Sequence, residues 1–286
     1  YAFDVLMQIY ESYGYSQRDA AKSIIENNIY GLDIDNRAYQ LAYFAVMMKA
    51  RQYNRRILNG ETNPHVYAIN ESNGINRDQL QYFGTGMDKM QRNIAMLQIQ
   101  GLLDTFIDAK EYGSLLNVDD YDWELLNKFM NNIGMAGQLS FDTVGIEDTQ
   151  DQLRLLVEIG AVMAQKYDVI VTNPPYMGLR GMSGILASFV QRCYPNSKTD
   201  LYSTFIEKCY DFSKQYGKVS MVTMHSWMFL TSFEQLRIKT LENCCFDNLV
   251  KQIVLRQLIK ITGKYLFMQQ FIFNCTWHIN FTTHNR

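Results

Sequence analysis

The sequence predicts an α/β protein with a parallel, doubly wound sheet. Short apolar runs that end in polar residues alternate with longer stretches of helical periodicity, which is the pattern of strands joined by helices. In such folds the connecting helices cover both faces of the sheet. With 286 residues, of which 47% are hydrophobic, the chain can bury one large core or two small ones.

Residues 1–77 are expected to form the first part of the sheet. The periodicity predicts three helices here, over residues 1–13, 17–27 and 36–54, with Leu41, Phe44, Ala45 and Met48 on one face of the third. Two strands are expected, over residues 28–35 and 66–70. The first helix has no capping residue before it, so we expect the chain to be truncated and to begin inside a domain.

Two further regions and a tail follow. Residues 78–165 are predicted to be a helical insertion that serves as a structural cover. Residues 166–247 are predicted to form the second part of the sheet, with strands over 167–172 and 217–224 and helices over 200–215 and 233–243. Residues 248–286 contain no acidic side chain, and we expect them to be a basic tail of separate origin.

The charge, the cysteine content and the hydropathy of the chain limit the classes of function that it can have. The formal net charge is −2, so a surface for nucleic acid has to come from local patches. Five cysteines without metal-ligand spacing predict a reduced, cytoplasmic protein with no metal site. No apolar run reaches the length of a membrane span and no signal peptide is recognisable, so no membrane partner is expected.

The tetrapeptide Asn173-Pro174-Pro175-Tyr176 directly follows the predicted strand 167–172. Two prolines can simply end a strand, but these four residues together suit a particular reaction. An exocyclic amine on a base is a weak nucleophile, because its lone pair is delocalised into the ring. The Asn173 side-chain oxygen and the Pro174 carbonyl can hold its two hydrogens, and consecutive prolines fix that carbonyl because each ring locks φ. Tyr176 offers an aromatic face to a base swung out of a duplex.

This tetrapeptide resembles the catalytic motif of amino-methyltransferases that act on N6 of adenine. Wider segments resemble the adenine-specific DNA methyltransferases of bacteriophage-exclusion (BREX) systems, namely residues 2–6, 31–42, 167–178, 194–202 and 225–230. The resemblance implies a Rossmann-like S-adenosylmethionine-dependent methyltransferase sheet, incomplete at its N-terminus. It implies S-adenosylmethionine as cofactor, DNA methylation in phage defence or restriction-modification, and other phage-defence proteins as partners. The family's glycine-rich cofactor loop is not recognisable in the sequence.

The same resemblance implies a cofactor site spread along the chain. Asp33, at the end of the predicted strand 28–35, is expected to accept hydrogen bonds from both ribose hydroxyls. Ile34 is expected to lie against the adenine ring, and Phe205 near it. Glu71 or Ser72 is expected to reach the adenine amine. An Asp after a strand can equally cap a helix, and Asp35 suits that role.

The DNA side is expected in residues 177–199, which have three basic residues and no acids: Arg180, Arg192 and Lys198. They would lie where the phosphates beside a flipped adenine in double-stranded DNA pass, although an ordinary solvated loop explains them equally well. Trp227 and Phe229 are candidates either for the base pocket or for the core. Two alternatives stay open: a methyltransferase acting on protein glutamine or on RNA, and a non-catalytic remnant that binds DNA or partner proteins.

Overall fold

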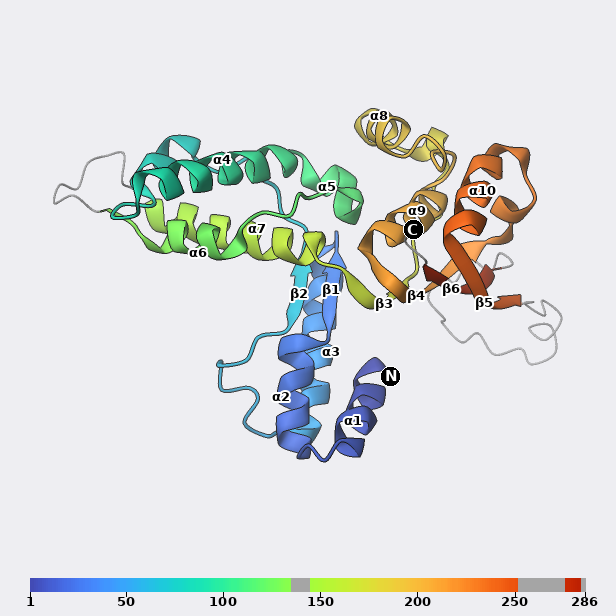
Figure 1. Cartoon of the computed structure of the whole chain (residues 1–286), viewed down its shortest axis with the longest axis horizontal. Helices are drawn as coiled ribbons and strands as arrows, with labels where there is room; N and C mark the ends of the chain where they lie inside the picture. Colours follow the sequence, from blue (N-terminus) through green and yellow to red (C-terminus); the bar gives the residue numbers. More distant parts are fainter. Residues whose placement is uncertain (135–144, 252–275, 284–286) are drawn as a thin grey trace, which may run out of the picture. The chain divides into compact units, whose positions relative to one another are not determined.

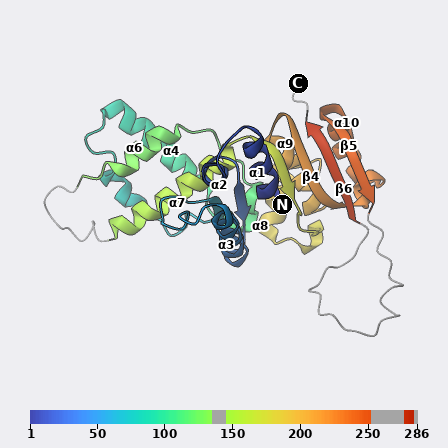
Figure 2. The ribbon, with the colours of Figure 1, turned by 90° about the horizontal axis from the view of Figure 1, so that it is seen from below.

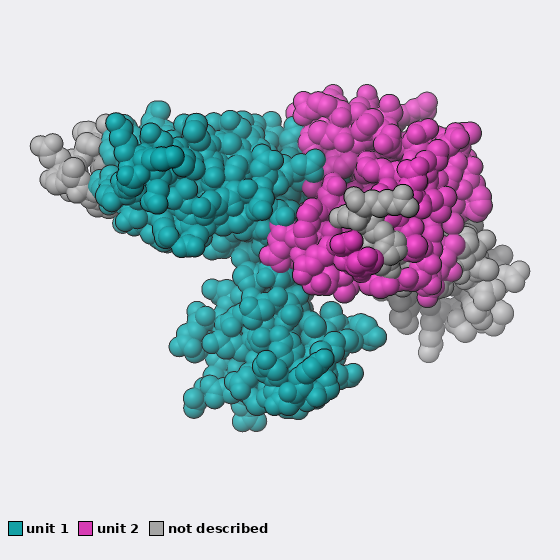
Figure 3. All heavy atoms as spheres, viewed as in Figure 1, with its two compact units in different colours: residues 1–164 teal, residues 165–286 magenta. Residues whose placement is uncertain are grey.

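The computed structural model describes residues 1–134, 145–251 and 276–283. The chain divides into two compact units, residues 1–164 and residues 165–286 (Figure 3). Both units mix helices with strands, as the sequence predicts. The described strands form two separate sheets, where the sequence analysis expected one. The predicted four-part division, at residues 77, 165 and 247, stays a prediction.

Unit 1 begins with α1, α2 and α3 around a short parallel ribbon. These elements are α1 (Ala2–Ser12), α2 (Gln17–Asn27), β1 (Tyr30–Asp33), α3 (Asn36–Tyr53) and β2 (His65–Ala68). In the ribbon, Tyr30 lies opposite His65 and Asp33 lies opposite Ala68. Each expected element of residues 1–77 is present within a few residues of its predicted bounds. The buried residues of this group include Phe3, Met7, Ile24, Ile25 and Met47.

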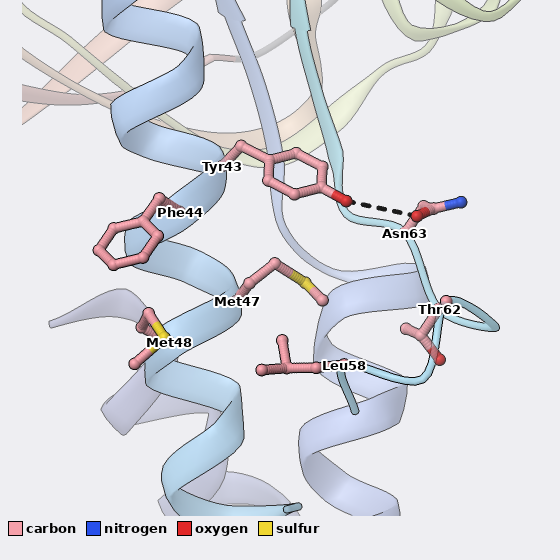
Figure 4. Close-up of a pocket in the computed structure, with 8 residues that line it drawn as sticks. Tyr43, Phe44, Met47, Met48, Leu58, Thr62 and Asn63 are labelled. Atoms are coloured by element: carbon pink, nitrogen blue, oxygen red, sulfur yellow. Dashed lines mark hydrogen bonds between the residues drawn. The ribbon is translucent and has the colours of Figure 1, made fainter. Parts of the chain in front are cut away.

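One face of α3 departs from the usual pattern of an amphipathic helix. The predicted stripe of Leu41, Phe44 and Met48 is exposed, by 69%, 60% and 40%, whereas Met47 and Ala50 face the core. A pocket of about 300 Å³ lies beside this stripe (Figure 4). It is lined by apolar side chains of α3 and by residues of the following loop, where Asn63 Oδ1 accepts a hydrogen bond from the Tyr43 hydroxyl at 3.3 Å.

The rest of unit 1 is helical. Its elements are η1 (Arg77–Tyr82), α4 (Lys89–Thr105), α5 (Ala109–Tyr112), η2 (Gly113–Leu115), α6 (Trp123–Asn131) and α7 (Ile146–Ala164). In Figures 1 and 2, α4, α6 and α7 lie alongside one another. Gly160 makes close packing possible, because a Cβ there would stand 2.9 Å from Leu102 Cδ1.

Unit 2 contains a mixed sheet of four strands in the order β3-β4-β6-β5. Its elements are β3 (Tyr167–Thr172), η4 (Leu179–Gly181), α8 (Gly184–Cys193), α9 (Leu201–Phe212), β4 (Ser213–Met224), η5 (His225–Met228), η6 (Thr231–Phe233), α10 (Glu234–Asn243), β5 (Cys244–Lys251) and β6 (Thr276–Thr283). β3 and β4 are parallel, and β6 runs antiparallel to both β4 and β5. Figure 2 shows β4, β6 and β5 side by side.

Three features of unit 2 differ from the expectations. α8 lies within residues 177–199, which were expected to be a loop, because Leu186, Phe189 and Val190 bury one side of it. β4 begins four residues early, and its register against β3 shifts between Tyr167 and Val169, where Tyr216 adopts a φ of 63°. The basic tail, residues 248–286, contributes the second half of β5 and all of β6, and β6 pairs between β4 and β5.

Candidate active site

The tetrapeptide Asn173–Tyr176 lies at the carboxyl end of β3, which is an outer strand of its sheet. Along β3 the side chains alternate: Ile170 packs against the core of unit 2, whereas Val169 and Val171 are 62% and 76% exposed. Asn173 follows the strand with its side chain exposed, and Pro174 is buried. The strand thus places the asparagine amide at an accessible sheet edge, on a backbone that the buried proline holds.

Tyr176 is held through its hydroxyl and through its ring. Its hydroxyl lies 3.3 Å from Asn173 Oδ1 and 3.2 Å from the carbonyl oxygen of Val222 on β4, and it donates toward both. The ring of Tyr202 meets the Tyr176 ring edge-on, at 6.1 Å between centroids. Burial raises the pKa of the Tyr176 hydroxyl, so it stays protonated and remains a donor at neutral pH.

The start of α9 supports the tetrapeptide. Asp200 Oδ1 accepts from the backbone N–H of Met177 at 3.1 Å and from that of Tyr202 at 3.3 Å. The Tyr202 hydroxyl lies 2.9 Å from Ser226 Oγ, and burial raises its pKa to about 12. No role was expected from the sequence for Asp200, Tyr202 or Ser226. An acidic residue three positions before Ser203 signals a helix cap, but nothing local signals its bond to Met177.

Phe205 and the aromatic pair after β4 take different positions in unit 2. Phe205 is half-buried on the second turn of α9, the helix that Asp200 caps. Trp227 is only 2% exposed and packs in the core of the unit, whereas Phe229 is 69% exposed. Of the two candidates for a base pocket, Trp227 is therefore a core residue and Phe229 is the one on the surface.

In unit 1, the two acids after β1 have separate roles. Asp35 caps α3, since its Oδ1 accepts from the backbone N–H of Arg37 at 2.8 Å. Asp33 Oδ1 accepts from the backbone N–H of Asp35, also at 2.8 Å. No described residue bonds the second carboxylate oxygen of Asp33, which is exposed at the end of the strand. Asp33 therefore has a free acceptor, and Asp35 is committed to its helix.

Ile34 and Glu71 lie against the same short segment, α5 with η2. The Ile34 side chain is 49% exposed, and its Cδ1 would lie 3.4 Å from a Cβ at Gly113. Glu71 Oε1 accepts from the backbone N–H of Lys110 at 3.3 Å. Ser72 is buried, and its hydroxyl donates to the Leu103 carbonyl at 2.6 Å, so of the two candidates for the adenine amine only Glu71 keeps an accessible side chain.

Arg180, Arg192 and Lys198 all have exposed side chains. Within the described chain none of the three forms an ion pair, whereas other lysines of unit 2 are paired: Lys214 with Asp168, Lys218 with Asp247 and Lys239 with Glu207. The two ends of the segment 177–199 pair with each other in an antiparallel ladder. Gly178 bridges Asp200, and the Leu179 N–H donates to the Thr199 carbonyl. Arg180 follows the tetrapeptide by four residues, and Lys198 directly precedes Thr199 of the ladder.

The described residues include neither a candidate metal site nor a membrane-spanning helix. No cluster of three His, Cys, Asp or Glu side chains that could hold a metal ion occurs among them. None of the helices described is both long and apolar enough to cross a membrane. Two pockets, one beside α3 (Figure 4) and one along η1 and α4, include none of the predicted site residues.

Comparison with known proteins identifies close sequence relatives. The chain is 41% identical over 239 residues to the adenine-specific methyltransferase PglX of Lacticaseibacillus casei (strain Zhang), covering 83% of this chain and 19% of that protein. It is 35% identical over 264 residues to the adenine-specific methyltransferase BrxX of Escherichia coli O9:H4 (strain HS), covering 86% and 22%. The chain thus spans about a fifth of the length of these curated relatives.

A solved structure from Listeria monocytogenes, described as a class I S-adenosylmethionine-dependent methyltransferase, aligns with 99% of this chain and 86% of its own. The identity is 11% and the TM-score is 0.31, which is too low to carry an argument. The family model described as Eco57I restriction-modification methylase matches residues 27–254, which include the tetrapeptide and the end of β1. The chain therefore belongs to the Eco57I restriction-modification methylase family.

Proposed function

We propose that this chain is the catalytic part of an S-adenosylmethionine-dependent methyltransferase that methylates N6 of adenine in DNA, in phage defence or restriction-modification. The observation that carries the proposal is the placement of Asn173 at the exposed carboxyl end of β3, with Tyr176 bonded beside it. Membership of a restriction-modification methylase family, and two relatives named adenine-specific methyltransferases, support the choice of substrate.

The chemistry assigned to the tetrapeptide is orientation of an amine. Asn173 Oδ1 and the Pro174 carbonyl would each accept one hydrogen of the adenine amino group, so that its lone pair turns away from the ring. No described residue donates to the Pro174 carbonyl, which leaves this acceptor available. The Tyr176 ring would hold the extruded base by stacking. No covalent enzyme intermediate is required, because the sulfonium of the cofactor already activates the methyl group.

The residues present suit the cofactor. Asp33 has an exposed carboxylate oxygen for the ribose hydroxyls, Ile34 an exposed apolar side chain for the adenine ring, and Glu71 an accessible acceptor for the adenine amine. Phe205 on α9 would supply an aromatic contact. We assign β1 to the strand of a Rossmann-like fold whose terminal acid binds ribose.

For the DNA, we assign phosphate contacts to Arg180, Arg192 and Lys198. Exposed cations that have no carboxylate partner can bind phosphates without first breaking an ion pair. The substrate would be double-stranded DNA with the target adenine flipped out, and the protein would act in the cytoplasm, alone or with other phage-defence proteins.

The test is product analysis. The chain would be incubated with labelled S-adenosylmethionine and DNA, and the digested nucleosides would be separated and identified by mass spectrometry. We expect N6-methyladenine without N4-methylcytosine, and loss of methylation in Asn173→Ala with cofactor binding nearly unchanged, because the asparagine acts mainly in the transition state. Methyl transfer to a release-factor glutamine or to RNA, but not to DNA, would contradict the proposed substrate. It would still agree with the proposed orientation of an amine by the tetrapeptide.

A further inference from the structure

Asp200 makes a contact that an ordinary helix cap does not make. A capping carboxylate accepts from the first backbone N–H groups of its own helix, as Asp122 does at the start of α6, where its Oδ1 lies 2.9 Å from the Leu125 nitrogen. Asp200 Oδ1 accepts from Tyr202 within α9, but it also accepts from Met177, 23 residues earlier and directly after the tetrapeptide.

Backbone bonds reinforce this contact. The Leu201 N–H donates to the Met177 carbonyl at 2.9 Å, and the Leu179 N–H donates to the Thr199 carbonyl at 3.2 Å. Gly178 and Asp200 form the antiparallel bridge between them. Residues 177–179 are thus bonded to residues 199–201, and both the N–H and the carbonyl of Met177 take part. Among these bonds, only the one from the Met177 N–H to the Asp200 carboxylate involves a side chain.

The fastening acts directly on the tetrapeptide. Met177 is bonded to Tyr176, whose hydroxyl contacts Asn173 Oδ1. Tyr202, two residues after Asp200, packs edge-on against the Tyr176 ring and is itself anchored through Ser226. Freeing Met177 would therefore release the backbone that sets the Tyr176 ring and, through its hydroxyl, the asparagine acceptor.

We infer that Asp200 is a positioning residue for the methyl-transfer site: one carboxylate oxygen caps α9 and also holds the Met177 amide, which fixes the Tyr176 ring and the Asn173 acceptor. This inference rests on the proposed function for its catalytic consequence. The hold on Met177 is a property of the protein alone, so it can be tested whether or not methyl transfer is found.

Three substitutions separate the cap from the hold on Met177. Asp200→Asn keeps an oxygen at the same position and should keep both bonds. Asp200→Ser keeps a good helix cap, but its side chain is shorter and should lose Met177. Asp200→Ala loses both. Asp122→Ala is the matched control, because it removes an aspartate cap that serves its own helix only.

The first measurement is amide hydrogen exchange of the intact chain. We expect residues 177–179 to exchange about tenfold faster in Asp200→Ser and Asp200→Ala, the effect of losing one hydrogen bond to a charged group, and at wild-type rates in Asp200→Asn and Asp122→Ala. Unchanged exchange of residues 177–179 in Asp200→Ser would overturn the inference. Should Asp200→Ala fail to fold, the comparison of Ser with Asn still decides it.

The second measurement is the rate of methyl transfer to DNA. We expect kcat to fall about tenfold in Asp200→Ser, with KM for S-adenosylmethionine unchanged, and to recover in Asp200→Asn. An equal loss in Ser and Asn variants would make the charge itself essential and would contradict a positioning role. Absence of DNA methylation by the wild-type chain would count against the proposed function. The hydrogen-exchange measurement would still show whether Asp200 holds the Met177 amide.

Discussion

At the scale of single residues, the two functions proposed for the tyrosine of the tetrapeptide can be separated. Its ring offers a stacking face, and its hydroxyl contacts Asn173 Oδ1 and the Val222 carbonyl. Tyr176→Phe keeps the ring and loses both contacts, so we expect kcat to fall about three- to tenfold. Tyr176→Ala also loses stacking worth about 1–3 kcal/mol per base, and KM for DNA should rise in this variant alone. Steady-state kinetics on DNA measures both, and equal KM values for the two variants would contradict the assigned stacking.

The two acids after β1 give a second test at this scale. Asp33 has a free carboxylate oxygen, whereas Asp35 caps α3. Asp33→Ala is expected to weaken S-adenosylmethionine binding by about 1–3 kcal/mol, the cost of losing a charged acceptor. Asp35→Ala should leave affinity closer to wild type and reduce stability by about 1 kcal/mol through the lost cap. Calorimetric titration and thermal melts measure the two effects, and a larger affinity loss for Asp35→Ala would move the ribose acid to position 35.

What the sequence could predict differs from residue to residue. Asn173 to Tyr176 are four adjacent residues, and the chemistry proposed for them could be derived from their types and from the strand before them. The division between Asp33 and Asp35 follows from the cap signal of α3. The bond between Asp200 and Met177 joins positions 23 residues apart, and the contact of Tyr176 with Val222 joins positions 46 apart. Neither pair has a local pattern, because each depends on how β3, β4 and α9 pack.

At the scale of elements, periodicity located the helices better than it located their buried faces. α3 was predicted within one residue at each end, yet its Leu41, Phe44 and Met48 are exposed. The helix has apolar side chains on two sides, and packing against α1 and α2 selects the side with Met47 and Ala50. α8 was missed because Gly178, Gly181 and Gly184 suggested a loop, whereas Leu186, Phe189 and Val190 were available for burial.

Helix α9 contains a buried lysine whose energetic effect has a definite pH dependence. Lys208 is 3% exposed, and its Nζ lies 4.5 Å from the centroid of the Phe212 ring. Burial lowers the pKa of its ammonium group to about 8, with Asp211 opposing the shift. The unfolded chain then holds more protons than the folded chain between pH 8 and 10.5, so stability rises with pH across this window.

We therefore expect Lys208→Met to stabilise the protein at pH 7, by up to about 3 kcal/mol, the value of a pKa shift of this size. The advantage should shrink as pH rises from 8 toward 10.5, because the wild-type lysine loses its charge there. Urea unfolding at pH 7, 9 and 10.5 measures it, with Lys214→Met, which removes an exposed lysine paired with Asp168, as the comparison. A gain that does not vary with pH would mean that packing and not charge burial sets the effect.

At the scale of the whole molecule, the α/β class and the parallel pairing of β1 with β2 and of β3 with β4 followed from the alternation of strands and helices. The antiparallel insertion of β6 between β4 and β5 did not. Sequence patterns give the existence of a strand, but the order of strands in a sheet depends on non-local pairing. For the same reason the acid-free composition of residues 248–286 gave no indication that they contribute half of β5 and all of β6.

Charge distribution leads to the last prediction. A chain with net charge −2 can bind DNA only through a local surplus of cations. Arg180, Arg192 and Lys198 are exposed, and none of them forms an ion pair with a described residue. Each phosphate contact contributes about 0.9 to the slope of log affinity against log salt concentration on duplex DNA. Replacing one of the three by alanine should lower the slope by about 1, and replacing all three by about 3.

Lys214→Ala is the matched control, because its ammonium group already lies 2.8 Å from the Asp168 carboxylate in the same unit. It should leave the slope unchanged, since a lysine neutralised by an acid releases few counterions when DNA binds. Fluorescence anisotropy with a labelled duplex over a range of salt concentrations measures all five variants. If the triple variant kept the wild-type slope, or if Lys214→Ala lowered it as much as a single substitution, the phosphate surface would lie elsewhere on the chain.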